Sequence, residues 1–285
     1  MRVRGPVLGV FDSGFGGLTV LRALLRTLPG AHFVYVGDTA RLPYGAKSQA
    51  TVARYAVETA RFLESRGAEI LVIACNTATA LALEDIRAAV KVPVVGVIEP
   101  GARAAAAVMG VESPGITSTM GLMRSEEVLV LATSATVQSQ AYERACASLG
   151  LRSAEKACPL LVPLVEEGWT EHPVTREVIR IYLREALATC APGAVLLGCT
   201  HYPLIEREIA AALHELGSAA AVIDSAQATA DAVAAALAWD VEALVEGGAA
   251  SFECFATDSV EKFQRLGSLF LQRPIPEVRL LDLGG

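Results

Sequence analysis

The sequence predicts an α/β protein built on two similar units with mostly parallel sheets. Short β-branched runs recur along the chain, and a longer segment of helical period follows each of them. A second observation is an internal echo: a strand, a cysteine, a polar residue and a helix follow one another at residues 73–77 and again at 197–201. Strands that are apolar on both faces and joined by helices belong in parallel sheets. The echo predicts that the two halves are related and pseudo-symmetric.

The predicted strands, in chain order, are residues 7–11, 32–37, 69–74, 93–98, 128–132, 194–198, 220–224 and 251–256. Between the second and third runs the residues follow a helical period, with apolar side chains on one face at Val52, Tyr55, Ala56, Phe62 and Leu63. Residues 110–126 contain glycine, proline and several hydroxyl residues, which predicts an irregular surface loop. In parallel sheets ligands bind at the carboxyl ends of the strands, so functional residues are expected directly after each run.

Composition excludes several classes of function. The chain has 285 residues, is 53% hydrophobic and carries 24 basic against 31 acidic residues, a net charge of −7. We expect no nucleic-acid or anionic membrane partner, because no sequence-wide positive field exists. The first apolar run is too short for a signal peptide, and the longest uncharged helical stretch, 232–239, is far below the roughly 20 residues of a membrane span. A cytoplasmic protein that binds a small molecule is therefore expected.

Six cysteines occur without the paired spacing of metal fingers, which predicts reduced thiols and no metal site. Cys75 ends an apolar run and precedes a helix, whose positive amino terminus stabilises a thiolate, so a lowered pKa is expected. An inert buried cysteine is the alternative. Cys199 occupies the matching place, next to Thr200 and His201. His201 alone reads as a capping or surface histidine, but beside a cysteine it is a candidate acid–base group.

Asp12 follows the first predicted strand and opens a glycine-rich loop at residues 12–17. The loop resembles a phosphate cradle but lacks the G-x-G-x-x-G spacing, and a carboxylate at its mouth favours an ammonium group over a phosphate. The alternative role for Asp12 is a helix N-cap. Pro43-Tyr44-Gly45 forms either an ordinary turn or one whose backbone amides receive a carboxylate. Glu166 is a solvated charge unless it faces one of the two cysteines.

Five motifs carry a resemblance to the glutamate racemase family. They read GVFDSGFGGLT at 9–19, YVGDTARLPYG at 35–45, ACNTA at 74–78, GVIEPG at 96–101 and GCTHYPL at 198–204. The two cysteine motifs in this order are highly specific, and the resemblance runs from about residue 7 to beyond residue 258. Residues 110–126 depart from the family, since this link is longer than usual.

The resemblance implies a cofactor-independent interconversion of L- and D-glutamate that supplies D-glutamate for peptidoglycan. It implies that Cys75 takes the proton from D-glutamate and Cys199 from L-glutamate, with Asp12 assisting near Cys75 and with Glu166 and His201 near Cys199. Implied substrate contacts are Asp12, Ser13, Pro43, Tyr44, Gly45, Asn76, Thr77, Thr133, Thr136, Thr200 and His201. Thr133 and Thr136 come after residues 110–126, the segment that departs from the family.

The chemistry read from the residues agrees with two thiols. Racemisation removes a Cα proton and returns one to the opposite face, which requires two acid–base groups. The usual alternative, pyridoxal phosphate, needs a lysine, and none of the four lysines lies in a Schiff-base context. No cofactor is therefore expected. Two other readings stay open: a racemase of the same superfamily acting on aspartate or hydantoins, and a non-catalytic nucleotide-binding module using the loop at 14–17.

The resemblance also implies an arrangement of domains. Residues 1–98 and 215–285 would form the first α/β domain and residues 99–214 the second, with the active site in the cleft between them. Cys75 and Cys199 would then approach the substrate from opposite sides. The family commonly forms dimers, so the resemblance admits a homodimer, which the residues themselves do not decide.

Overall fold

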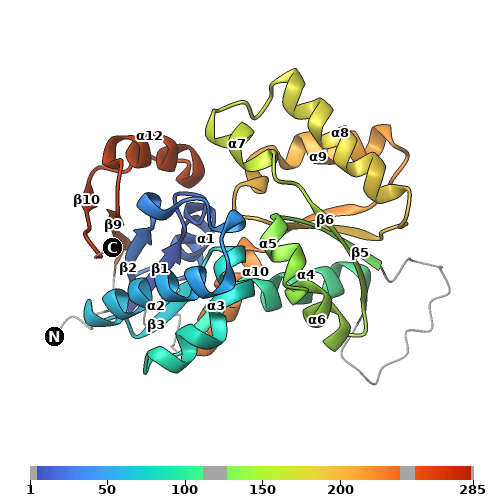
Figure 1. Ribbon diagram of the computed structural model, residues 1–285. Helices are drawn as coiled ribbons and strands as arrows, with labels where there is room; N and C mark the ends of the chain where they lie inside the picture. Colours follow the sequence, from blue (N-terminus) through green and yellow to red (C-terminus); the bar gives the residue numbers. More distant parts are fainter. Residues whose placement is uncertain (1–4, 112–126, 238–247, 284–285) are drawn as a thin grey trace. The chain divides into compact units, whose positions relative to one another are not determined.

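The computed structural model describes residues 5–111, 127–237 and 248–283 and contains two parallel sheets with helices between the strands (Figure 1). The chain divides into two compact units, residues 1–97 with 226–285 and residues 98–225. Most of the predicted surface loop at 110–126 lies outside the described residues. The predicted fold class, α/β with two parallel sheets, is confirmed.

The first unit is built on a six-stranded sheet of order β10-β9-β2-β1-β3-β4 in which every pairing is parallel. Its strands are β1 (Val7–Asp12), β2 (His32–Gly37), β3 (Ile70–Ile73), β4 (Val94–Gly96), β9 (Ser251–Ala256) and β10 (Val278–Leu280). All residues of β1 and β3 are buried, as expected for central strands covered on both faces.

Among its described residues, the first unit also has five helices and two short 3-10 segments. They are α1 (Leu18–Thr27), η1 (Thr39–Arg41), η2 (Tyr44–Ala46), α2 (Gln49–Ser65), α3 (Asn76–Ala89), α10 (Ala226–Leu237) and α12 (Val260–Leu271). Helix α2 packs against α3, and α1 packs against α10 and α12. The predicted apolar face of α2 is its buried face, with Val52, Ala56 and Leu63 fully covered.

The second unit has a four-stranded parallel sheet of order β6-β5-β7-β8. Its strands are β5 (Glu127–Ala132), β6 (Arg152–Ala157), β7 (Ala194–Gly198) and β8 (Ala221–Asp224). Its helical segments are α4 (Ile98–Met109), α5 (Ser134–Gln138), α6 (Ala141–Ser148), α7 (Leu161–Glu166), α8 (Pro173–Leu187), η3 (Tyr202–Ile205) and α9 (Glu206–Glu215). Because β8 pairs with β7, this unit continues to Ser225, past the boundary expected at residue 214.

Two strands were not predicted from the sequence. Strand β6 reads RSAEKA and β10 reads VRL, and each lies at the edge of its sheet. An edge strand keeps contact with solvent and needs no continuous apolar run, so the periodicity that reveals central strands is missing. The eight predicted strands are all present, three of them with the predicted bounds.

Both sheets share one winding. In each sheet the second strand along the chain lies on one side of the first strand, and the third strand lies on the other side of the first. Doubly wound sheets bind ligands at this switch point, outside the carboxyl ends of the first and third strands. In the first unit these are the ends of β1 and β3, where Asp12 and Cys75 lie. In the second they are the ends of β5 and β7, where Thr133 and Cys199 lie.

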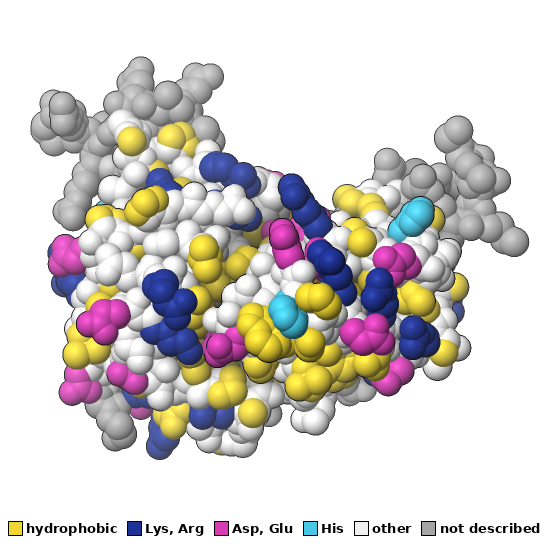
Figure 2. Space-filling model, turned by 90° about the horizontal axis from the view of Figure 1, so that it is seen from above, with side chains coloured by type: hydrophobic (Ala, Val, Ile, Leu, Met, Phe, Trp, Pro, Cys, Tyr) yellow, Lys and Arg dark blue, Asp and Glu magenta, His cyan; other side chains and the backbone are white. Residues whose placement is uncertain are grey.

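One face of the molecule shows how the charged side chains are distributed. On the face seen in Figure 2, Lys and Arg side chains lie among Asp and Glu side chains, so neither sign dominates there. Within the described part of the chain, no helix has the length and apolar character needed to cross a membrane.

Candidate active site

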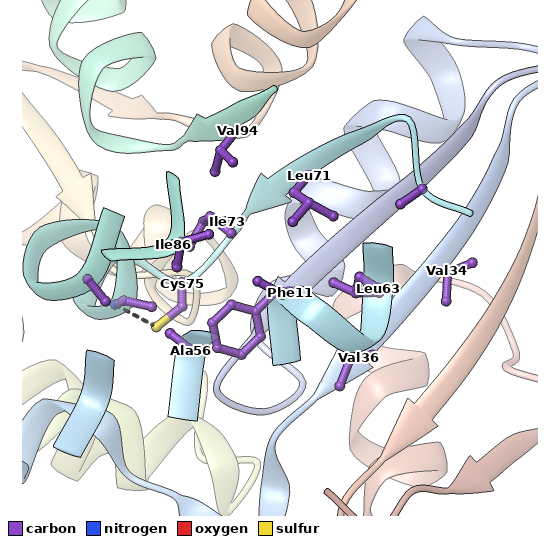
Figure 3. Close-up of a cluster of buried hydrophobic side chains, with 14 of the residues drawn as sticks. Phe11, Val34, Val36, Ala56, Leu63, Leu71, Ile73, Cys75, Ile86 and Val94 are labelled. Atoms are coloured by element: carbon purple, nitrogen blue, oxygen red, sulfur yellow. Dashed lines mark hydrogen bonds between the residues drawn. The ribbon is translucent and has the colours of Figure 1, made fainter. Parts of the chain in front are cut away.

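Cys75 lies two residues beyond β3 and is the N-cap residue of α3. Its Sγ accepts a hydrogen bond from the Ala78 backbone amide at 3.4 Å and lies 3.4 Å from Ser13 Oγ, to which it donates. Figure 3 shows the sulfur at the margin of the apolar cluster that includes Phe11 and Ala56. Cys75 is only 5% exposed. The thiol therefore sits where the sequence places it, at a strand end against a helix amino terminus.

Asp12 is the last residue of β1 and is buried, with 1% exposure. Its Oδ2 accepts a hydrogen bond from the Gly14 amide at 2.9 Å, while Gly17 occupies the N-cap position of α1. The alternative that Asp12 is the helix N-cap is therefore wrong. A Cβ at Gly17 would lie 2.6 Å from the Asp12 Cβ, so this glycine is needed for the close approach of the loop to the carboxylate.

The predicted lowering of the Cys75 pKa is wrong. Burial and the negative charge of Asp12 raise the pKa of Cys75, and the hydrogen bonds with Ser13 and Ala78 lower it only in part, which leaves it at about 12. The sequence showed the helix amino terminus, whose effect on charge is modest. It did not show how completely the sulfur is desolvated, and desolvation is the larger effect.

Cys199 directly follows β7 but differs from Cys75 in its surroundings. The chain continues from Cys199 into the 3-10 segment η3 before α9 begins, so this cysteine does not cap an α-helix. Its Sγ lies 3.9 Å from Nδ1 of His201, and Nε2 of the same ring lies 3.2 Å from Oε1 of Glu166. The reading of Glu166 as a solvated charge is wrong, because the carboxylate is joined through His201 to Cys199. All three come from one unit.

Glu166 ends α7, in the connection that follows the second strand of its sheet, and its side chain is 18% exposed. The His201 ring between Glu166 and Cys199 is 5% exposed. Burial lowers the pKa of His201, but the contacts with Cys199 and Glu166 outweigh burial and raise it to about 10. The structure thus favours an imidazolium between the sulfur and the carboxylate.

The remaining predicted contact residues fall into two groups, one in each unit. In the first, Asn76 and Thr77 open α3 beside Cys75 and are each 3% exposed. Tyr44 packs in the same apolar cluster as Cys75 and is 1% exposed. Ser13 joins this group through its bond with Cys75, and Pro43 and Gly45 flank Tyr44 in the chain.

In the second unit, Thr200 lies 3.4 Å from the His201 ring, measured from its Oγ1 to Nδ1. Thr133 caps α5, and its Oγ1 lies 2.9 Å from Oγ1 of Thr136. Thr136 is fully buried, so within this pair its hydroxyl holds the Thr133 side chain in place. Substrate contact by either threonine stays a prediction.

Asp38 is a buried polar residue of the first unit, near the group around Cys75, which we call the first site. The sequence analysis assigned no role to Asp38. It follows β2 and is 0% exposed, and its carboxylate accepts a hydrogen bond from the Tyr44 hydroxyl at 2.5 Å. Burial raises the pKa of Asp38, although the hydroxyls of Tyr44 and Thr257 and the charge of Arg41 offset part of this rise. The sequence did contain a signal for Asp38, because this aspartate follows an apolar run just as Asp12 does.

The chemical capacity of the two groups is acid–base chemistry. Each contains one buried thiol at a strand end, with a carboxylate close to it or joined to it through an imidazole. In the described ranges, no group of three or more His, Cys, Asp or Glu side chains is placed to hold a metal ion.

Comparisons with known proteins agree over nearly the whole chain. The sequence profile of the Asp/Glu/Hydantoin racemase family matches residues 8–233. A glutamate racemase of Koribacter versatilis is 48% identical over 303 aligned residues, covering 98% of each chain. The crystal structure of glutamate racemase isoform RacE1 from Bacillus anthracis has a TM-score of 0.85 and 33% identity, covering 99% of each chain. Glutamate racemase from Francisella tularensis, solved with D-glutamate, has a TM-score of 0.84 and 31% identity, with the same coverage.

Proposed function

The chain belongs to the Asp/Glu/hydantoin racemase family of amino-acid racemases, and we propose that it interconverts L- and D-glutamate by a two-base proton transfer at Cα. One observation carries the mechanism. Cys75 and Cys199 follow the third strand of two sheets with the same winding, so each thiol lies at the switch point of its own unit.

The proton transfers follow from this pairing. One cysteine, as thiolate, takes the Cα proton of one enantiomer, and the other, as thiol, gives its proton to the opposite face of the same carbon. After one turnover the first sulfur is protonated and the second is a thiolate, which is the starting state for the reverse reaction. By resemblance to the family motifs, we propose that Cys75 acts on D-glutamate and Cys199 on L-glutamate. No cofactor takes part in this route.

Each thiol would be activated differently. On the Cys75 side, an ammonium group of the substrate beside Asp12 would offset the negative charge that helps to raise the pKa of Cys75. On the Cys199 side, the imidazolium of His201 lies next to the sulfur and stabilises negative charge on it. Glu166 keeps the ring charged and fixes its orientation from the other nitrogen.

The predicted substrate contacts are divided between the two units. In the first unit Asp12 and Ser13 would hold the ammonium end, and Asn76 and Thr77 with the backbone amides of Tyr44 and Gly45 would receive the carboxylates. In the second unit Thr133, Thr136, Thr200 and His201 would complete the site. The two-base mechanism requires both sulfurs to reach one carbon of the substrate. A supply of D-glutamate for peptidoglycan, a cytoplasmic location and a homodimer belong to the same proposal.

A racemisation assay without added cofactor tests the activity. L-glutamate and D-glutamate should each give the other enantiomer, and aspartate or a hydantoin should react far more slowly. Faster turnover of aspartate or a hydantoin would instead support the related racemase. Nucleotide-dependent thermal stabilisation that survives loss of both cysteines would support the nucleotide-binding module.

Single variants test the two-base mechanism. Cys75→Ser and Cys199→Ser should each abolish racemisation in both directions, because a hydroxyl has a far higher pKa than a thiol. Cys254→Ser is the matched control for Cys75, and Cys146→Ser is the matched control for Cys199. Each removes another buried thiol from the same unit, and both variants should stay active. In heavy water, early product from L-glutamate should carry deuterium at Cα while recovered L-glutamate carries little. Equal early labelling of substrate and product would indicate a single base and refute the pairing.

A further inference from the structure

A buried carboxylate, Asp38, lies beside the first site at the carboxyl end of β2. Its backbone amide donates to the Asp12 carbonyl at 3.0 Å, which ties the end of β2 to the end of β1. Its two carboxylate oxygens have different partners. Oδ2 accepts from the Tyr44 hydroxyl at 2.5 Å, and Oδ1 accepts from the Thr257 hydroxyl at 2.8 Å.

Both partners belong to segments around the predicted carboxylate turn. Tyr44 is inside the turn itself, within η2. Thr257 follows β9, in the segment of chain that returns to the first unit, and its Oγ1 also accepts from the Ala40 amide at 2.9 Å. Thr39 adds a further tie, because its hydroxyl donates to the Asp258 carbonyl at 2.5 Å. The returning segment therefore holds the beginning of the 39–46 connection, and Asp38 holds its end.

We propose that Asp38 is a positioning residue that sets the backbone amides of Tyr44 and Gly45 for a substrate carboxylate. This inference rests on the proposed function. The Tyr44 ring is 1% exposed and its hydroxyl is bonded to Asp38, so the side chain serves as an anchor for the turn. In this proposal the backbone amides of the anchored turn face the substrate carboxylate. Asp38 acts on the substrate only through this anchor.

A carboxylate is the side chain that suits both partners. Two hydroxyls donate to it, one to each oxygen, and hydrogen bonds to a charged acceptor are about twice as strong as neutral ones. Asparagine has one acceptor oxygen and would present an amide N–H group to one of the hydroxyls. The substitution therefore keeps the size of the side chain while it weakens the hold on the turn.

Three variants test the role: Asp38→Asn, Tyr44→Phe and Thr257→Val. In Asp38→Asn and Tyr44→Phe we expect KM for glutamate to rise about tenfold with kcat within about threefold, because a misplaced turn weakens binding and leaves the two thiols in place. Thr257→Val should raise KM by a smaller factor. The inhibition constant of glutarate, a dicarboxylate without an ammonium group, should rise in parallel with KM.

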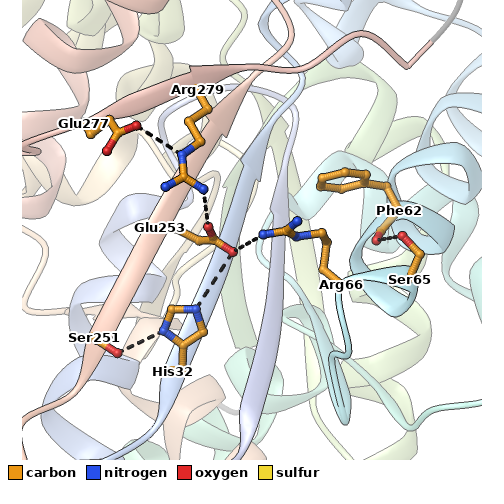
Figure 4. Close-up of polar contacts among 8 residues, drawn as sticks. All are labelled: His32, Phe62, Ser65, Arg66, Ser251, Glu253, Glu277 and Arg279. Carbon is orange, nitrogen blue, oxygen red and sulfur yellow. Dashed lines mark hydrogen bonds and ion pairs between the residues drawn. The ribbon is translucent and has the colours of Figure 1, made fainter.

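Glu253→Gln is the matched control. This carboxylate also ties β9 to its neighbours, since Arg66 and Arg279 each donate to it at 2.9 Å and His32 lies 3.9 Å away (Figure 4). The same carboxylate-to-amide change there should lower the midpoint of thermal unfolding and leave KM within about twofold. A general loosening of the unit would raise KM in the control as well, and this result would overturn the positioning role.

The outcomes separate the two proposals. A wild-type protein that does not racemise glutamate refutes the proposed function. A racemase whose KM and glutarate inhibition are unchanged in Tyr44→Phe and Asp38→Asn keeps the proposed function and refutes the role of Asp38. Tyr44→Phe removes only one hydroxyl, so the test remains decisive if Asp38→Asn fails to fold.

Discussion

Glu166→Gln probes the charge of the His201 ring, which links the carboxylate to Cys199. The variant keeps the size and shape of the side chain and removes its negative charge. Glu166 Oε1 lies 3.2 Å from His201 Nε2, and an opposite charge at this range changes a pKa by about 1 to 3. The pKa of His201 should therefore fall from about 10 toward about 7 to 9, with the sulfur of Cys199 still raising it.

The stability consequence has a definite sign. In the wild type the folded-state pKa of His201 lies above its unfolded value, so the folded protein binds this proton more tightly. The stability that this proton contributes is present in full below the unfolded pKa of 6.5 and is lost as the pH rises toward 10. Glu166→Gln removes the part due to Glu166, about 1 to 4 kcal/mol. Its deficit in unfolding free energy should be largest near pH 6 and should shrink toward pH 10.

NMR titration of the histidine ring signals measures the pKa directly. The chain has four histidines, and a His201→Asn variant identifies the signal by its loss. Urea unfolding of wild type and Glu166→Gln at pH 6 and pH 10 measures the stability difference. A His201 that titrates near 6.5 in the wild type, or a pKa that Glu166→Gln leaves unchanged, would refute the reasoning.

Two further substitutions test the first site. Asp12→Asn keeps an oxygen that can accept from the Gly14 amide, so the fold should persist while kcat for both enantiomers falls at least about a hundredfold. The pKa of Cys75 should also fall, because the variant removes the negative charge that helps to raise it. The pH dependence of Cys75 alkylation measures this pKa. Full activity in this variant would show that Asp12 has only a structural role. Gly17→Ala places a methyl group 2.6 Å from the Asp12 Cβ and 2.8 Å from the Ala74 Cβ, so thermal unfolding should show a loss of about 1 to 3 kcal/mol, and an unchanged midpoint would contradict the close approach.

The central strands and the positions of the two thiols could be predicted from the sequence. Strands such as β2 and β7 are continuous apolar runs, and a run of this kind is set by local composition alone. Cys75 and Cys199 each follow such a run, and in a parallel sheet the residue after a strand lies at the ligand-binding edge. Those two facts required no knowledge of long-range contacts.

Long-range packing decided the rest. The sequence placed Glu166 among charged residues, and only the folded chain brings it to His201, which is 35 positions away. The same holds for Asp38 and Thr257, which are 219 positions apart. The pKa of Cys75 moved opposite to the expected direction because burial depends on every segment packed around the sulfur, whereas the helix amino terminus that favours a thiolate is a local feature visible in the sequence. Local patterns therefore fixed where the reactive groups lie, and tertiary contacts fixed their partners and their protonation.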